Sequence, residues 1–552
     1  MHLPQTSSGN QIPQHSLRNY VLLFTVFFTI TFLVYLPALH SGFVFDFINM
    51  VFDFRKGPGL FDFSKGIQFD FINRFVFKAW LKLWGYNAWA WHFLQCFLHS
   101  INGVFLYALM GIMLRRFQFS QVRWLSLLTA LCFLLNPYQT EPLVWGGDLN
   151  YLLVGNFILL SLLAFAHYLQ NPKNSYLVIA ALALIAGAFT HELGWFILPA
   201  DVVLAIFLAP ELRAIANKNN LKFWAAAIVL MALYFGNKLL SGELLGHYGS
   251  AVHLRFQPAE LISAFFKYIF KIVLLGNFLP GKVVSKIYLW IDKLPVAALL
   301  FTILLITLVT GFLFTKKKPA LKVPLALFLL FAIFVFPILN LYFPYWIKIH
   351  GDRYCYITSA FIVGSVITGL YLIRPIAACV YAITYLIASS FFLAHNISSW
   401  QHAATICNKL EKSYHWQNAR QVYILNLPDN YRGAYMYRSK QHSQFASYFI
   451  KYGIGNMPDG NKITEVLNYN LNQPADSVTV QIVAPGELKV SLAQWGTWWW
   501  RNTLGATSYE DSLVKVHIDD YNHGYNVVFK QKQPGDIFIY SANGQWRQVP
   551  GF

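Results

Sequence analysis

Tyr20 to Ala38 read YVLLFTVFFTITFLVYLPA, an uninterrupted apolar run without a charged side chain. A helix needs about 20 such residues to cross the hydrocarbon core of a bilayer. Similar runs follow along the chain, and together they predict about eleven transmembrane helices, the others near 88–112, 124–137, 149–169, 176–190, 193–209, 222–240, 294–314, 322–341, 356–373 and 376–394. The first run exceeds the apolar core of a signal peptide and lacks a small-x-small cleavage site, so we expect a retained anchor.

The composition excludes an ordinary soluble enzyme. Of the 552 residues, 56% are hydrophobic and 12% are charged, whereas soluble domains carry about 25% charged residues. Most of the net charge of +18 precedes residue 395, because only 14 of the 42 Lys and Arg and 11 of the 24 Asp and Glu follow residue 394. Basic residues between spans set topology. We therefore expect no nucleic-acid partner.

The basic loops predict the orientation in the membrane. With residues 1–19 in the cytoplasm, the loops holding Arg115, Lys173, Arg213, Lys316 and Arg374 all fall inside, as the positive-inside rule requires. This assignment requires that residues 258–293 do not cross the bilayer. We expect them to form an interfacial helix pair that carries lysines at 267, 271, 282 and 286.

These expectations divide the chain into three parts. A cytoplasmic segment (1–19) precedes an all-α transmembrane domain (20–394), whose outer loops 40–87 and 241–293 contain interfacial helices. Residues 395–552 then form a small β-rich domain outside, with a helix near 400–414 and strands near 421–427, 477–483, 488–493, 514–518, 525–530 and 537–540. The five scattered cysteines form no disulfide framework. This favours the inner membrane of a bacterium, with the tail in the periplasm.

Acidic residues are rare before residue 395, and four sites with ionisable residues fall at outer span ends. They are Asp46 after the first span, Glu141 after the third, His191-Glu192 after the fifth and Asp352-Arg353 before the tenth. Ionisable groups at membrane depth are costly and therefore point to function. Each also has a structural explanation: a turn or helix cap, a loop acid, a polar helix junction and a surface ion pair, respectively.

Several motifs around these residues resemble type C glycosyltransferases, above all the transmembrane O-mannosyltransferase group and related bacterial enzymes. Gly42-Phe43-Val44-Phe45-Asp46 resembles the first-loop pattern, and Asn136-Pro137-Tyr138-Gln139-Thr140-Glu141 resembles the family's P-x-x-T-E element. Thr190-His191-Glu192 and Asp352-Arg353-Tyr354-Cys355-Tyr356 follow in the family's order. The sequence departs from the family where Phe47 replaces a second acid and Asp352 replaces Glu.

The resemblance implies transfer of a sugar from a polyprenyl-phosphate carrier to a glycan, lipid or protein hydroxyl outside the membrane. Asp46 is then the candidate base and Arg353, beside Asp352 and Tyr354, the candidate phosphate ligand. Glu141 and Glu192 position the acceptor or orient Arg353, and His191 donates to a phosphate or sugar hydroxyl. No cofactor is assigned, and a divalent metal stays open.

Arg74, with Lys78 and Lys82 four and eight residues later, either guides the anionic carrier or snorkels to lipid headgroups. Membrane lipids are expected partners in both cases. The membrane part has neither a Gly-rich phosphate loop nor an Asp-x-Asp pair, which favours a lipid-linked donor over a nucleotide sugar.

Three other functions stay open. A transporter or flippase of lipid-linked glycans also places rare charges in a membrane cavity. A glycan polymerase or ligase would use a diphosphate-linked donor instead. A scaffold would display the tail, whose Trp495, Trp498, Trp499 and Trp500 either stack on sugars or belong to an aromatic core or belt.

Overall fold

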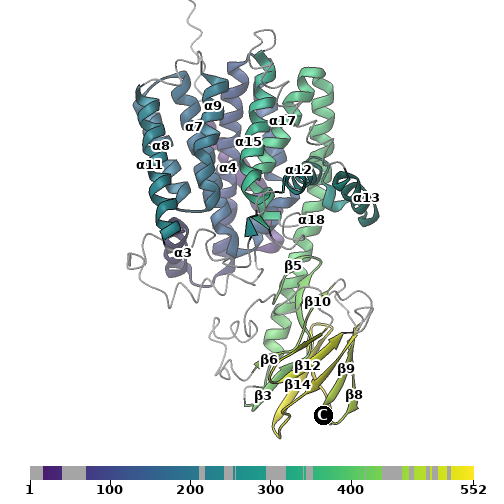
Figure 1. Cartoon of the computed structure of the whole chain (residues 1–552). Helices are drawn as coiled ribbons and strands as arrows, with labels where there is room; N and C mark the ends of the chain where they lie inside the picture. Colours follow the sequence, from purple (N-terminus) through teal and green to yellow (C-terminus); the bar gives the residue numbers. More distant parts are fainter. Residues whose placement is uncertain are drawn as a thin grey trace, which may run out of the picture.

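The structure is a computed structural model. It describes residues 17–39, 41, 70–209, 218–240, 253–254, 257–293, 319–339, 341–342, 352–416, 418–437, 463–471, 478–492, 498–499, 508–518 and 524–552. In Figure 1 most of the chain is a bundle of long, roughly parallel helix axes, and the C-terminal region is a group of β-sheets at one end of the bundle. Helix α18 runs through the bundle and continues into the β-sheet region.

A helix occupies each predicted span that falls on described residues: α1 (Leu17–Tyr35), α4 (Ala88–Arg116), α5 (Val122–Leu134), α7 (Leu149–Gln170), α8 (Asn174–Ala188), α9 (Ile197–Leu208), α11 (Lys218–Leu240), α15 (Lys322–Leu339), α17 (Tyr356–Ile373) and α18 (Pro375–Ser413). The predicted span at 294–314 lies outside the described residues. Six helical segments in the described part are long and apolar enough to cross a bilayer: 17–38, 88–116, 146–170, 319–339, 352–373 and 375–413. Helices α5 and α8 are apolar but shorter.

The long helices pack closely because small residues line their contacts. Helix α7 packs against α4, α8 and α9, and α15 packs against α17. A Cβ atom added at Gly155 of α7 would lie 2.9 Å from the ring of Tyr356 on α17. The Tyr356 hydroxyl is itself hydrogen-bonded to His99 (2.8 Å) and Asn102 (2.9 Å) of α4. Small residues and paired polar groups of this kind are typical of helix contacts in membranes.

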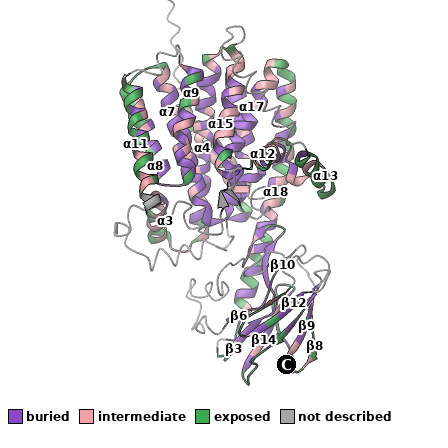
Figure 2. Ribbon diagram, viewed as in Figure 1, coloured by how far each residue is buried: buried purple, intermediate pink, exposed green. Residues whose placement is uncertain are grey.

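The outer surface of the bundle is apolar, as contact with lipid requires. On α18 the exposed side chains include Ile376, Val380, Ile383, Ile387 and Phe391, spaced three or four residues apart. This spacing puts them on one helix face. Figure 2 shows the same division, with buried residues toward the inside and exposed residues on the outer helices.

Three amphipathic helices flank the bundle: α3 (Phe71–Trp84), α12 (Pro258–Val273) and α13 (Gly281–Asp292). In Figure 1, α12 and α13 run across the direction of the long helices, and neither is among the segments able to cross a bilayer. Lys282 and Lys286 are exposed, as expected of an interfacial pair. Lys267 is instead buried and pairs with Asp292 at 2.6 Å, tying α12 to α13.

The C-terminal region is rich in β-structure, as predicted. One sheet has the order β15-β14-β3-β6, a second β11-β12-β13-β9-β8 and a third β10-β7-β4-β5. The bounds are β3 Gln421–Ile424, β4 Leu427–Tyr431, β5 Ala434–Tyr435, β6 Ile463–Glu465, β7 Asn468–Leu471, β8 Thr479–Ala484, β9 Glu487–Ser491, β10 Trp498–Trp499, β11 Ser508–Glu510, β12 Val514–Ile518, β13 Gly524–Phe529, β14 Asp536–Ala542 and β15 Gln545–Gln548.

Residue alternation explains why these segments form strands. In β12, Val514, Val516 and Ile518 are buried, whereas the residues between them are exposed. Trp498 and Trp499 form β10, which pairs with β7; Trp495 and Trp500 lie outside the described residues.

Helix α18 joins the two regions without a break. It has 39 residues, which corresponds to a length of about 58 Å, and it runs past the predicted boundary at residue 394. The β-sheet region is fixed to its final turns, because Tyr437 donates to the Cys407 carbonyl (3.1 Å) and Trp546 donates to the Leu410 carbonyl (2.8 Å).

Candidate functional site

Glu141 lies in a short helix at the end of the bundle nearest the β-sheet region. Asn136 caps the preceding turn by accepting a 2.9 Å hydrogen bond from the Tyr138 backbone N–H. Pro137 then begins a 3-10 turn (Pro137–Gln139), where its missing N–H is not needed. The chain continues into α6 (Thr140–Val144), which places Glu141 in a first helical turn, where a negative charge is stabilised.

Arg353 binds Glu141 through both its side chain and its backbone. Nη1 of Arg353 lies 2.7 Å from Oε1 of Glu141, and the Arg353 backbone N–H donates to Oε2 at 2.8 Å. Both side chains are largely buried, with exposed fractions of 18% and 8%. The sequence predicted that these two residues lie at the same end of the bundle; the structure brings them into direct contact.

Asp352 pairs with a lysine of α12. Nζ of Lys271 lies 3.0 Å from Oδ1 of Asp352, and the Lys271 side chain is fully buried. Burial alone lowers the pKa of Lys271, but Cys355 and Asp352 outweigh it and raise the pKa above its usual value, so the ammonium stays charged. The structural alternative of a surface ion pair between Asp352 and Arg353 is therefore wrong, because each residue pairs with a partner elsewhere in the chain.

Aromatic rings surround the Arg353 guanidinium and connect it to His191. The guanidinium carbon lies 4.9 Å from the Tyr354 ring centre and 5.3 Å from that of Trp145. The Tyr151 ring lies 6.1 Å from Tyr354 and 4.6 Å from His191. His191 is thus separated from Tyr354 by one aromatic ring.

His191 begins a 3-10 turn (Glu192–Phe196) that follows α8. Its Nδ1 accepts a 3.1 Å hydrogen bond from the Leu193 N–H, which places the proton of the neutral ring on Nε2. That Nε2 lies 3.5 Å from Oε2 of Glu192, whose side chain is half exposed. The turn sits close against α8, because a Cβ added at Gly194 would lie 2.1 Å from the Gly187 backbone.

Arg74 belongs to the adjoining helix α3. It pairs with Asp70 at 2.6 Å. The backbone N–H of Ile72 donates to the Phe189 carbonyl at 2.9 Å, which holds α3 beside the turn of His191. Of the predicted site residues that the structure describes, Glu141 and Asp352 line the neighbouring cavity, whereas Arg74, His191, Glu192, Arg353 and Tyr354 do not.

Asp46 lies outside the described residues. The preceding described residue is Ser41, whose carbonyl lies 3.2 Å from Nε2 of His92. Nδ1 of His92 lies 3.2 Å from the Leu143 carbonyl, so the chain at Ser41 is close to α6.

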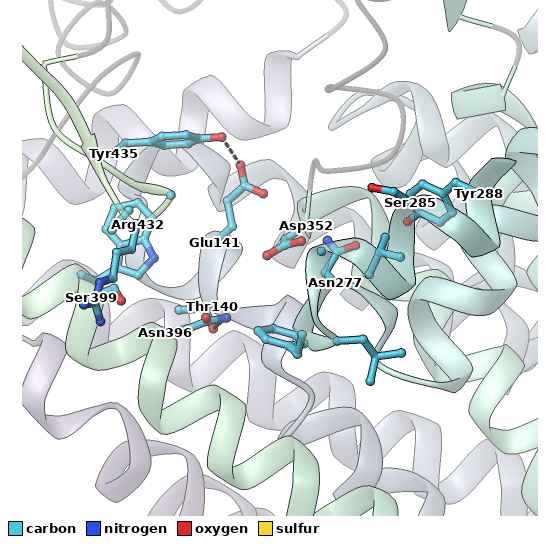
Figure 3. Close-up of a pocket in the computed structure, with 17 residues that line it drawn as sticks. Thr140, Glu141, Asn277, Ser285, Tyr288, Asp352, Asn396, Ser399, Arg432 and Tyr435 are labelled. Atoms are coloured by element: carbon cyan, nitrogen blue, oxygen red, sulfur yellow. Dashed lines mark hydrogen bonds between the residues drawn. The ribbon is translucent and has the colours of Figure 1, made fainter. Parts of the chain in front are cut away.

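A cavity of about 570 Å³ lies beside the two ion pairs. Figure 3 shows Glu141 and Asp352 between two walls. One wall comes from α13 and the preceding turn, with Asn277, Ser285 and Tyr288; the other comes from α18 and the β4–β5 turn, with Asn396, Ser399, Trp400 and residues 432–435. Tyr435 donates a 2.8 Å hydrogen bond to Oε1 of Glu141.

Several of these residues were not predicted from the sequence. Lys271 was expected at an interface, yet it is one of only two lysines in the apolar stretch 261–279, which was itself a signal of a buried partner. Asn396 and Trp400 extend the last span with a polar and an aromatic residue. Tyr435 and Arg432, in the tail, carry no local signal of contact with the membrane part.

The part of the chain that the structure describes contains no group of three or more His, Cys, Asp or Glu side chains able to hold a metal ion. Comparison of the chain with models of known protein families gave no match, and comparison with curated protein sequences gave none either. Function is therefore inferred from the site itself.

Proposed function

We propose that the protein is a membrane glycosyltransferase of type C that moves a sugar from a polyprenyl-phosphate donor to a hydroxyl acceptor. The observation that carries the proposal is the grouping of two carboxylates and two cations beside a 570 Å³ cavity at one end of an apolar helix bundle. Cavities of about 300–1,000 Å³ with a few convergent polar groups are typical of small-molecule sites.

The reaction needs few protein groups. The acceptor oxygen bonds to the anomeric carbon, and the bond from that carbon to the phosphate oxygen breaks, with its electron pair going to the phosphate. The acceptor proton passes to a carboxylate, and polyprenyl phosphate leaves. Attack opposite the leaving group inverts the anomeric centre. We assign the proton-accepting role to Asp46 on the resemblance of its motif.

Arg353 is the proposed phosphate ligand. A guanidinium has five N–H donors in a planar fork and stays charged in a dry site. In the structure Nη1 donates to Glu141 and Nη2 donates to Tyr354. The other N–H groups of the guanidinium can then donate to an anion. Glu141 then acts by orienting Arg353, and His191 contacts the substrate from the other side of Tyr151.

The proposal includes an orientation. The chain crosses the inner membrane of a bacterium about eleven times, with the N-terminus in the cytoplasm and the β-sheet region in the periplasm. Support comes from α12 and α13, which lie across the bundle, and from the exposed lysines and apolar residues of α13, which helices at a membrane surface also have. Lys271 of α12 pairs with Asp352, the neighbour of Arg353, so a lipid-linked donor would approach Arg353 from the membrane beside these helices.

One observation favours a second candidate, a flippase for lipid-linked glycans. Asp201 on α9 is fully buried within the bundle and accepts a 3.3 Å hydrogen bond from Ser161 of α7. Transport pathways place acids at such depth. The ion pairs at the end of the bundle favour chemistry at the surface, and transfer assays separate the two functions.

The test is sugar transfer by the full-length protein in proteoliposomes supplied with a panel of polyprenyl-phosphate and polyprenyl-diphosphate sugars. We expect transfer from a monophosphate donor, at least about 100-fold slower in Asp46→Asn and Arg353→Lys, and unchanged in Arg547→Gln, whose residue is exposed on β15. Full activity of Asp46→Asn would reject Asp46 as the base. Use of diphosphate donors alone would indicate a polymerase or ligase, whereas lipid translocation without transfer, lost in Asp201→Asn, would establish the flippase.

Mass spectrometry of envelope glycans and glycoproteins from a deletion strain would identify the sugar and the acceptor. A missing sugar residue is the expected result.

A further inference from the structure

The cavity beside Glu141 has one wall that comes from the C-terminal region. We propose that this cavity is the acceptor site and that the β4–β5 turn (Tyr431–Tyr435) is the element that selects a glycan as acceptor. The inference rests on the proposed function, which leaves the acceptor class open.

The β4–β5 turn has a defined backbone shape. Arg432 and Gly433 connect the paired residues Tyr431 and Ala434, and both have positive φ (48° and 90°). Positive φ at both central residues is the type I′ hairpin turn. The Gly433 N–H donates to the Asn430 side chain at 2.9 Å, which fixes the turn. This conformation is unfavourable for a residue other than Gly, yet the chain has Arg432 at a position that lines the cavity.

Contacts on several sides hold the turn over the cavity. Tyr435 donates to Glu141 of the bundle, and its ring packs against Trp145 (5.2 Å) and Trp400 (5.8 Å). Two residues further on, Tyr437 donates to the Cys407 carbonyl of α18. The wall is thus preorganised, which lowers the entropic cost of binding a ligand.

The lining chemistry suits a carbohydrate. Asn396, Ser399 and Trp400 lie on one face of α18, and Ser285 and Tyr288 lie on one face of α13. Asn396 and Ser399 already donate to the carbonyls of Pro137 and His395, so their oxygens serve as acceptors. The hydroxyls of Ser285 and Tyr288 can both donate and accept, as sugar hydroxyls do. The rings of Trp400 and Tyr435 offer apolar faces to the C–H side of a sugar.

The two carboxylates that line the cavity do not require a cationic ligand. Glu141 and Asp352 are already paired, with Arg353 and Lys271. A peptide acceptor would be expected to use a longer free strand edge for main-chain pairing, but β5 at the edge of its sheet has two residues. Arg432 then donates to hydroxyl or ring oxygens of the bound glycan.

The experiment measures binding and transfer separately with the full-length protein in lipid nanodiscs. Saturation-transfer NMR is recorded with a panel of methyl glycosides and with a Ser/Thr-containing peptide. We expect a methyl glycoside to bind wild type and to bind Arg432→Gln about tenfold more weakly, the effect of losing one charge-assisted hydrogen bond. Tyr435→Phe, which keeps the ring but frees Glu141 from the phenol, should weaken binding less. Arg547→Gln, an exposed arginine of the same region outside the cavity, should bind as wild type.

Transfer kinetics then give a second readout. In Arg432→Gln the KM for the glycoside acceptor should rise about tenfold, while the KM for the lipid donor stays unchanged. Transfer with an unaltered acceptor KM in this variant would overturn the inference and leave the proposed function standing. Glycoside binding that depends on Arg432 without transfer from any donor would keep the glycan site and reject the proposed function. The glycan assignment would be overturned if the peptide binds and no glycoside does. It would also be overturned if neither the peptide nor any glycoside binds.

Discussion

Oε1 of Glu141 accepts a hydrogen bond from the Tyr435 hydroxyl at 2.8 Å while lying 2.7 Å from Nη1 of Arg353. One carboxylate oxygen therefore joins the start of α17, the short helix α6 and the C-terminal region. Because its carboxylate is largely buried, Glu141 depends on both partners for the hydrogen bonds that replace water.

This shared oxygen predicts unequal effects of two conservative substitutions. Glu141→Gln should lower stability by about 3 kcal/mol, because it leaves the buried Arg353 charge unpaired. Tyr435→Phe should lower it by about 1 kcal/mol, the value of one hydrogen bond. Thermal unfolding in detergent measures both, and the double variant should fall short of the sum, since the residues are in contact. Equal shifts for the two single variants would contradict the arrangement.

The Lys271–Asp352 pair predicts a rescue. Lys271→Met should lower stability by about 3 kcal/mol, because it leaves Asp352 with an uncompensated charge. Adding Asp352→Asn should restore much of the loss, since the remaining group is neutral. Lys282→Met, at an exposed lysine of α13, is the matched control and should change stability by less than about 0.5 kcal/mol. The unfolding midpoint is the measurement. If Asp352→Asn does not restore stability, the loss in Lys271→Met does not come from the unpaired Asp352 charge.

The turn of His191 should be intolerant of any side chain at Gly194. A Cβ there would lie 2.1 Å from the Gly187 carbonyl carbon and oxygen, which are backbone atoms and cannot rotate away. Gly194→Ala should therefore separate the turn from α8 and sharply reduce the yield of folded protein. Gly236→Ala on α11, where a Cβ meets nothing within 4 Å, should fold normally. Size-exclusion profiles after detergent extraction compare the two, and a normal profile for Gly194→Ala would refute the close packing.

The proposed orientation predicts which cysteines react in intact cells. Cys379 is the exposed native cysteine among the described residues and is first replaced by Ser. A cysteine at Arg547, in the C-terminal region, should then react with a membrane-impermeant maleimide when only the outer membrane is permeabilised. A cysteine at Lys173, an exposed residue between α7 and α8, should react only after the inner membrane is opened. The reverse pattern would place the site on the cytoplasmic side.

Hydropathy and residue alternation predicted much of the fold, because both depend on local sequence. The apolar runs coincide with helices wherever the structure describes them, and the predicted strand at 514–518 is β12. The clustering of Glu141 with Arg353 was expected because both lie at span ends on one side. Their direct contact, however, needs the packing of α6 against the turn before α17, which no local pattern specifies.

The missed residues depend on contacts between distant segments. Lys267 and Lys271 are spaced four apart on an amphipathic helix, a pattern that also fits a membrane surface. Only the packing of α12 against α13 and α17 buries them beside Asp292 and Asp352. The contact of Tyr435 with Glu141 was not predicted, because residues 395–552 were expected to form a separate domain. The unbroken helix α18 instead holds this region against the end of the bundle.

The continuity of α18 links the distance of the β-sheet region from the bundle to its rotation about the helix axis. Each residue inserted between Trp400 and Cys407, before the turns that hold the β-sheet region, would shift that region along the helix axis by about 1.5 Å and turn it by about 100°. A single insertion would swing the region away from Glu141, whereas seven residues would restore its direction but lift it by about 10 Å. The length of this helix therefore sets how the β-sheet region is oriented relative to the bundle. Only insertions or deletions close to a whole number of helical turns keep the β4–β5 turn facing Glu141.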